Sequence, residues 1–326
     1  MKHLLTTAAM LAASASVAAA EVAVSGNGRM GVVYNGEDLN FSSRIRVAFT
    51  LSGETDGGLT FGGSFRADNA GGAANGSAGE IFVSGAFGTT AMGDVVGAAE
   101  AVIGDLPEVG FTDLSSDVLT YGVFENGLAL GQNDIAYLTG DSSTTAAGNP
   151  VLLYTYTAGN LTVALSFNDG NGPNVADSTN EIIFDTPDTQ EFALGLRYDL
   201  GDYGVALGYE VADPSVATTA KHIIVAVDAT FGATEVKAFY GRASGAALLA
   251  GESVAQYGVG VTSTFDALTV KGYVKQWDDP IGGDVMSYGV GAEYSLGGGA
   301  TVAGGIVDND LAGTDPRADL GIKFTF

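Results

Sequence analysis

The feature that most constrains this chain is alternation with a period of two, which is the signature of half-buried β-strands. In the segment FSSRIRVAFTLS, large apolar residues such as Phe41 and Ile45 share one face, whereas Arg44 and Arg46 share the other. The closing decapeptide, RADLGIKFTF, alternates in the same way up to its last residue. Such segments predict strands with one apolar and one polar face.

The alternating segments are joined by links that are alternately short and long. The short, turn-like links lie near residues 53–58, 88, 159–160, 201–202, 232–233, 266–267 and 297–299. The longer polar links cover residues 35–40, 69–79, 94–149, 168–188, 212–220, 244–251, 278–284 and 310–316. Seven short and eight long links join sixteen strands in up-and-down order, with all short turns at one end. We see no domain boundary and predict a single domain over 21–326.

The polarity of the two faces distinguishes a soluble sandwich from a membrane barrel. A sandwich covers its apolar face with a second sheet, and an exported adhesin or lectin of that kind is one alternative. Sixteen sequential antiparallel strands leave edges that closure removes, and an inner face with arginines and acids cannot be a packed core. No window after the first twenty residues approaches the ~20 apolar residues of a membrane helix. We therefore predict an all-β, transmembrane, sixteen-stranded antiparallel barrel with lipid outside and water inside.

The N-terminal segment MKHLLTTAAMLAASASVAAA has the pattern of a secretory signal. Lys2 provides the basic start, an apolar stretch follows, and Ala18 and Ala20 form a small-x-small end. We predict a signal peptide over 1–20 and a mature chain that begins at Glu21. Because every backbone N–H in lipid needs a partner, both mature ends must lie inside the ladder, and we expect Glu21 near Phe326 at the barrel closure.

Composition excludes several classes of function. Without the signal segment, 12 Lys and Arg oppose 38 Asp and Glu, so the surface repels nucleic acid. Cysteine is absent, which rules out thiol chemistry and disulfides. His222 is the single histidine outside the signal segment, too few for a zinc site, and we interpret it as structural. We expect no enzyme and no required cofactor; a barrel enzyme that uses carboxylates is the alternative.

Basic residues are concentrated in the first three strands and the last. Four arginines lie on the predicted inner face of the first three strands: Arg29, Arg44, Arg46 and Arg66. Lys323 points inward on the neighbouring closing strand. Adjacent strands lie about 5 Å apart, so these side chains are expected to form one positive wall. Between residues 67 and 196 there is no Lys or Arg but there are 17 Asp and Glu.

The link 94–149 is far longer than an ordinary connection, which is typical of a functional loop. Its acids stand among apolar residues that would be misplaced on a solvated tip: Asp94, Glu100, Asp105, Glu108, Asp113 and Asp117. We expect the loop to fold into the barrel, narrow the bore and present these carboxylates opposite the arginines. An outward acidic loop is the alternative.

The segments IGDLPEVGFTDL, NPVLLYTYTAG, GGIVDNDL and ADLGIKFTF closely resemble the general diffusion porins of Rhodobacter-type purple bacteria. The resemblance covers essentially the whole mature chain. It implies a homotrimer among the lipid and lipopolysaccharide of a Gram-negative outer membrane, with each pore constricted by the third long loop. The arginines above match the family's basic wall. Four loop acids match its acidic side: Glu100, Asp105, Glu108 and Asp113.

The resemblance also implies calcium bound among the loop carboxylates, with Glu100, Asp105 and Glu108 as candidate ligands. Segment 115–134 is longer than the corresponding family segment. The implied function is passive passage of small polar solutes and ions. The acidic excess favours cations, so weak cation selectivity is expected. A substrate-specific channel is the alternative within this class.

Overall fold

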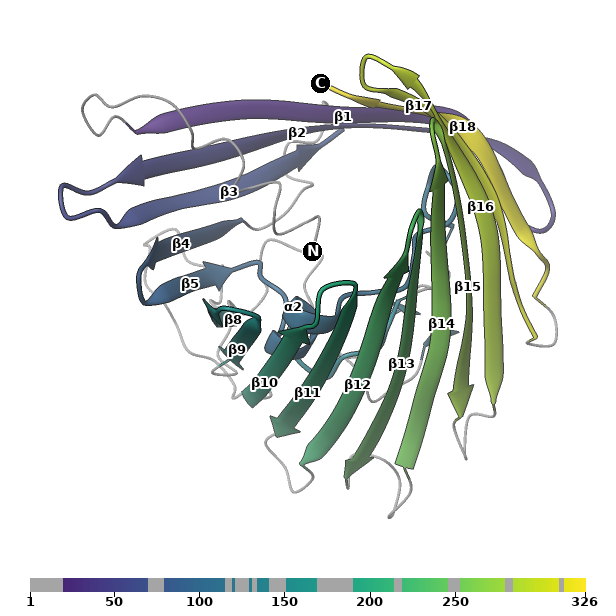
Figure 1. Cartoon of the computed structure of the whole chain (residues 1–326). Coiled ribbons are helices and arrows are strands. Elements are labelled where there is room, and N and C mark those ends of the chain that lie inside the picture. The colour runs from purple at the N-terminus through teal and green to yellow at the C-terminus, as the bar shows by residue number, and fades with distance from the viewer. Residues whose placement is uncertain are drawn as a thin grey trace, which may run out of the picture.

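The computed structural model describes residues 20–69, 79–114, 119–120, 129–130, 134–140, 151–168, 190–213, 219–245, 253–278, 284–310 and 314–326. It is a closed barrel of sixteen antiparallel strands, each hydrogen-bonded to its neighbours (Figure 1), so the predicted fold class is confirmed. The first five strands are β1 (Glu21–Tyr34), β2 (Leu39–Glu54), β3 (Thr60–Asp68), β4 (Glu80–Gly85) and β5 (Gly88–Gly93). The next six are β8 (Val151–Ala158), β9 (Leu161–Asn168), β10 (Gln190–Asp199), β11 (Tyr203–Asp213), β12 (Ala220–Phe231) and β13 (Thr234–Gly245). The last five are β14 (Ser253–Phe265), β15 (Leu268–Asp278), β16 (Val285–Gly297), β17 (Ala300–Asn309) and β18 (Arg317–Thr325).

The connections follow the predicted rhythm. Tight turns join β2 to β3, β4 to β5, β8 to β9, β10 to β11, β12 to β13, β14 to β15 and β16 to β17. The chain leaves the barrel sheet between β5 and β8, where the third long loop holds helix α2 (Ala98–Ile103) and the short pair β6 (Leu119–Thr120) and β7 (Ala129–Leu130). Among the described residues, no helix is long and apolar enough to cross a membrane.

The outer face of the barrel is apolar and uncovered. Phe41 on β2 is 96% exposed and Val24 on β1 is 63% exposed, and large apolar residues are likewise exposed on strands all round the barrel. The sheet closes on itself, and among the residues that the structure describes no second sheet packs against this face, so the soluble sandwich is contradicted. An apolar band that faces outward is what a hydrocarbon surrounding requires.

The barrel closes between the two terminal strands, as predicted, but in a different register. The backbone N–H of Phe326 donates to Gly26, and that of Gly26 donates to Phe326, at 2.8 and 3.2 Å. Glu21 is paired with Ser52 on β2, about 16 Å further along β1 at 3.3 Å per residue. The expected proximity of Glu21 and Phe326 is therefore wrong. Closing a barrel of tilted strands staggers their ends, so the first and last residues do not meet.

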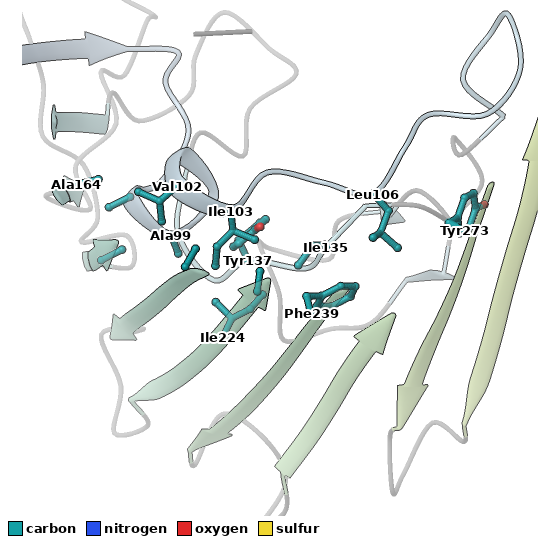
Figure 2. Packing of buried hydrophobic residues seen from close by; sticks show 14 of the residues in the cluster. Ala99, Val102, Ile103, Leu106, Ile135, Tyr137, Ala164, Ile224, Phe239 and Tyr273 are labelled. Carbon is teal, nitrogen blue, oxygen red and sulfur yellow. The ribbon is translucent and has the colours of Figure 1, made fainter. Parts of the chain in front are cut away.

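The hydrophobic core lies between the third loop and the inner wall. Figure 2 shows side chains of α2 and of the loop, including Val102, Ile103 and Leu106, beside Ile224 and Phe239 of the barrel strands. The loop therefore folds into the barrel, as expected, and the alternative of an outward loop is wrong for its described residues.

Candidate functional site: the loop and the basic wall

Strand register places three lumenal cations in one row. Arg29 on β1 is paired with Lys323 on β18 and, on its other side, with Arg44 on β2. Alternation along each strand turns all three side chains to the same face of the sheet. The predicted basic wall is thus formed by the register of three neighbouring strands.

Two further arginines complete the wall and share one carboxylate. Asp68 on β3 accepts from Arg46 Nε at 2.8 Å and from Arg66 Nε at 2.7 Å. Lys323 is bonded to Glu293 on β16 at 2.7 Å. We expected the counter-charge to come from the loop, but for these three cations the barrel wall itself supplies it. A carboxylate between two guanidinium groups offsets their mutual repulsion.

The loop meets the basic wall at Arg29. Arg29 Nη1 donates to the carbonyl of Thr112 at 2.7 Å and to that of Phe111 at 3.4 Å. Asp319 on β18 accepts from the backbone N–H of Phe111 at 3.1 Å and from that of Thr112 at 2.8 Å. It also accepts from the Thr112 hydroxyl at 2.6 Å. In this loop turn, the negatively charged Asp319 therefore binds the N–H donors, and the positively charged Arg29 binds the carbonyl acceptors.

Glycines in the wall allow the loop backbone to approach closely. A Cβ at Gly321 would lie 2.7 Å from the ring of Phe111, and a Cβ at Gly208 would lie 2.6 Å from Cβ of Ala99 in α2. Phe111 is only 1% exposed as a result. The loop thus packs closely along the inner wall. Its helix α2 contacts β9–β12, and Phe111 contacts β18 and β1.

A second anchor is a buried polar cluster beneath residues 135–139. Glu210 on β11 accepts from the backbone N–H groups of Leu138 and Thr139 and from His222 Nδ1 on β12, the last at 2.6 Å. Gln256 on β14 accepts from the Ala136 N–H at 2.9 Å and donates to its carbonyl at 2.6 Å. The side chains of Glu210 and His222 are fully buried. His222 therefore has the structural role that we predicted.

The loop acids divide into two groups. The carboxylates of Glu108 and Asp113 lie near enough to Arg29 to attract it. Glu100 and Asp105 lie instead with Asp134, against the lysine-bearing part of the wall. Because the loop crosses much of the inner wall, its acids cannot all face one patch.

Burial and mutual repulsion perturb the second group. Burial, followed by repulsion from Asp105, raises the pKa of Glu100 to about 8. Burial and repulsion from Asp134 raise the pKa of Asp105 to about 6, although its hydrogen bond from the Ile135 N–H opposes the rise. The barrel wall encloses Asp105, but its side chain is exposed in the lumen, and its pKa is raised less than that of Glu100.

Lysines of the wall bind backbone carbonyls of the loop near this group. Lys237 on β13 donates to the carbonyls of Ile103 and Asp105 at 2.5 and 2.9 Å. Lys275 on β15 donates to the carbonyl of Asp134. These two lysines were not predicted as site residues. They place positive charge beside the two carboxylates whose pKa is raised, those of Glu100 and Asp105.

The remaining two predicted loop acids are Asp94 and Asp117. Asp94 lies half-buried at the start of the loop, where its N–H donates to the Gly79 carbonyl at 2.9 Å. Asp117 lies outside the described residues, as does most of segment 115–134, of which only the backbone pair β6–β7 and Asp134 are described.

The three candidate calcium ligands are not gathered into one site. Glu108 lies toward the arginines, whereas Glu100 and Asp105 lie toward Asp134. Within the described ranges, no group of three or more His, Asp or Glu side chains is arranged to hold a metal ion. The residues present do not fit the expected site, and calcium binding stays a prediction.

Comparison with known proteins identifies the class of this barrel. A family model described as a Gram-negative porin matches residues 6–314. A porin from Rhodobacter capsulatus is 48% identical over 324 residues, which is 94% of this chain and 100% of the relative. The chain belongs to the Gram-negative porin family. Family and fold together place this porin in an outer membrane, as a channel protein.

Solved porin structures agree with this assignment. A porin refined at 1.8 Å resolution shares 45% sequence identity with a TM-score of 0.78, over 94% of this chain and 100% of that one. A substituted porin from Rh. blastica is 24% identical with a TM-score of 0.65 over the same shares, and this likeness shows the fold alone.

Sequence reasoning missed the wall residues that hold the loop of this porin: Asp319, Glu210, Gln256, Lys237 and Lys275. The one available signal was their position on inner faces of strands. That signal does not single them out, because any polar residue is expected on a face that lines a water-filled channel. Their partners lie 71 to 208 residues away in sequence, so no local pattern reveals them.

Proposed function

We propose that this porin is a general diffusion channel, in which small polar solutes and ions pass passively through a water-filled bore. The bore is narrowed between the basic wall, formed by Arg29, Arg44, Arg46, Arg66 and Lys323, and the acidic residues of the third loop. The single observation that supports this best is the inward loop, attached at Arg29 with Glu108 and Asp113 close to it.

Charges of opposite sign on two sides of a narrow water-filled slot produce a transverse field. Polar solutes and ions exchange part of their hydration for contacts with the walls, whereas apolar solutes must disrupt oriented water. Passage is driven by the concentration gradient alone and requires no cofactor.

Weak cation selectivity follows from the total charge. Without the signal segment, 12 Lys and Arg against 38 Asp and Glu give a net charge of −26, which raises the local concentration of cations at the mouths and in the bore. The five basic residues of the wall oppose this effect at the constriction, which keeps the preference weak.

Residues 1–20 serve as an export signal, and the mature porin assembles as a homotrimer among outer-membrane lipid and lipopolysaccharide. The matched family and the wide apolar outer face support this part of the proposal. The buried position of His222 weighs against a barrel enzyme that uses this histidine, because its ring has no access to a solute.

Reversal potentials across planar lipid bilayers under a KCl gradient test the proposal. The wild-type channel should show a small potential of the sign for cation preference, and Arg44→Gln with Arg46→Gln should enlarge it, because two opposing charges are removed. A chain that forms no channel, or a double variant with unchanged potential, would contradict the proposed constriction.

A further inference from the structure

We propose that Arg29 and Arg44 form a binding site for a phosphate-class oxyanion inside the constriction. The inference rests on the proposed channel function and names a class of solute that the constriction binds, beyond simple passage.

The first step is the distribution of counter-charge along the wall. Arg46 and Arg66 are neutralised by Asp68, and Lys323 by Glu293. Within the part of the chain that the structure describes, neither Arg29 nor Arg44 forms a salt bridge with a carboxylate. Two of the five cations in the wall therefore have no carboxylate in direct contact, although carboxylates attract Arg29 and Arg44 from a greater distance.

The second step is the relative position of these two arginines. Arg29 and Arg44 are direct partners in the β1–β2 ladder, so their Cα atoms are about 5 Å apart and their side chains enter the lumen side by side. Repulsion between adjacent guanidinium groups favours a shared anion between them, because arginine does not lose its proton. Asp319 does not serve as this anion, since it is occupied by the Phe111 and Thr112 donors.

The third step is the donors left unused. The Nε atoms of Arg29 and Arg44 are both buried, and neither has a hydrogen-bond acceptor among the described residues. A buried N–H without an acceptor is costly, and native proteins supply a partner for nearly all such groups. Two orphaned donors on directly paired residues thus point to one bridging acceptor.

The chemistry of the ligand follows from these donors. A guanidinium fork matches two oxygens of one anion, and two adjacent forks match an anion with three or four oxygens. Phosphate and phosphate monoesters have that many oxygens and carry between one and two negative charges at neutral pH. Chloride offers one centre and acetate offers two oxygens, so both bind more weakly here.

Single-channel recordings in planar bilayers test this site, with KCl as the conducting salt and inorganic phosphate as the probe at constant ionic strength. We expect a saturable fall in conductance as phosphate rises, and none with acetate over the same range. The reversal potential should shift toward cations at the same concentrations, because bound phosphate cancels positive charge of the wall.

Variants separate a specific site from general attraction. Arg44→Gln should weaken the phosphate effect about tenfold or more, the change expected when a charge-assisted hydrogen bond is lost. Arg44→Lys keeps the charge but lacks the fork, and should still weaken it several-fold. The matched control is Arg197→Gln, which removes one lumenal positive charge from β10 and should leave phosphate affinity within about twofold. The KCl conductance of each variant reports that its barrel has folded.

A linear or absent phosphate effect in a channel that conducts KCl would overturn the site and leave the proposed function intact. Undiminished phosphate affinity in Arg44→Lys, or an equal loss in Arg197→Gln, would reduce the effect to general electrostatics and also overturn the site. A folded chain that conducts no KCl would instead contradict the proposed function, and this inference with it.

Discussion

Arg29 and Asp319 bind opposite polar groups of the same loop residue: Arg29 donates to the Thr112 carbonyl at 2.7 Å, and Asp319 accepts from the Thr112 N–H at 2.8 Å. The two charged residues lie on strands that are paired at the barrel closure. The seam between β1 and β18 therefore also determines where the constricting loop touches the basic wall.

Asp319→Asn should loosen this attachment. The neutral amide replaces a carboxylate that accepts three hydrogen bonds, and each charge-assisted bond contributes roughly 1.5–3 kcal/mol. We expect faster hydrogen exchange at Phe111 and Thr112 and greater current noise in the open channel. Glu235→Gln, which removes the same charge on β13, is the control. Unchanged exchange at both amides would show that Asp319 does not hold the loop.

Glu210→Ala should destabilise the second anchor. It leaves the N–H groups of Leu138 and Thr139 and the ring of His222 without their acceptor, at a cost of about 3 kcal/mol for this buried cluster. Hydrogen exchange over residues 135–139 and thermal unfolding in detergent measure the loss. Glu210→Gln retains one acceptor oxygen and should be intermediate; equal stability of all three proteins would contradict the role of the cluster.

Acidity should tighten the loop and reduce cation preference. The pKa of Glu100 is raised to about 8, above its ordinary value of 4.5, so the folded protein binds this proton more strongly than the unfolded chain does. The resulting stabilisation is present below pH 4.5 and is lost as pH rises through about 8.

Reversal potentials recorded from pH 5 to pH 9 measure the corresponding change in selectivity. Cation preference should rise over this window as Glu100 becomes charged, and the Glu100→Gln variant should show a flatter profile. A wild-type profile identical to that of the variant would refute the assignment.

Gly208→Ala should displace helix α2, because the added Cβ would lie 2.6 Å from Cβ of Ala99 and 2.7 Å from a methyl group of Ile224. Overpacking of this kind costs about 1–3 kcal/mol, which thermal unfolding detects. Gly28→Ala is the control, since its nearest neighbour would be 3.6 Å away. Equal destabilisation by both substitutions would contradict close packing of α2 on the wall.

The barrel was predictable because lipid and water act on opposite faces of each strand. Phe41 and Arg44 differ in polarity for that reason, and the same contrast, repeated between short turns, gives the strand number. Stagger at the closure was not predictable, since the offset of Glu21 from Phe326 depends on strand tilt, which leaves no mark in the local pattern.

The loop was predictable in direction but not in path. Apolar residues such as Val109 and Phe111 indicated burial, and both are buried on the wall. The division that places Glu108 near Arg29, and Glu100 away from it, depends on which wall residues bind the loop backbone. Those contacts join distant parts of the chain and follow from three-dimensional fit alone.

The central claim is that arginine-bearing faces line water while the alternate residues face lipid, and thiol accessibility tests it most directly. The natural chain has no cysteine, so each introduced thiol is unique. We expect a sulfonate-bearing, membrane-impermeant thiol reagent to modify Arg44→Cys and lower the channel conductance, and to leave Ile45→Cys unmodified. Reaction at Ile45→Cys, or reaction at Arg44→Cys without a change in current, would contradict a bore bordered by the basic wall.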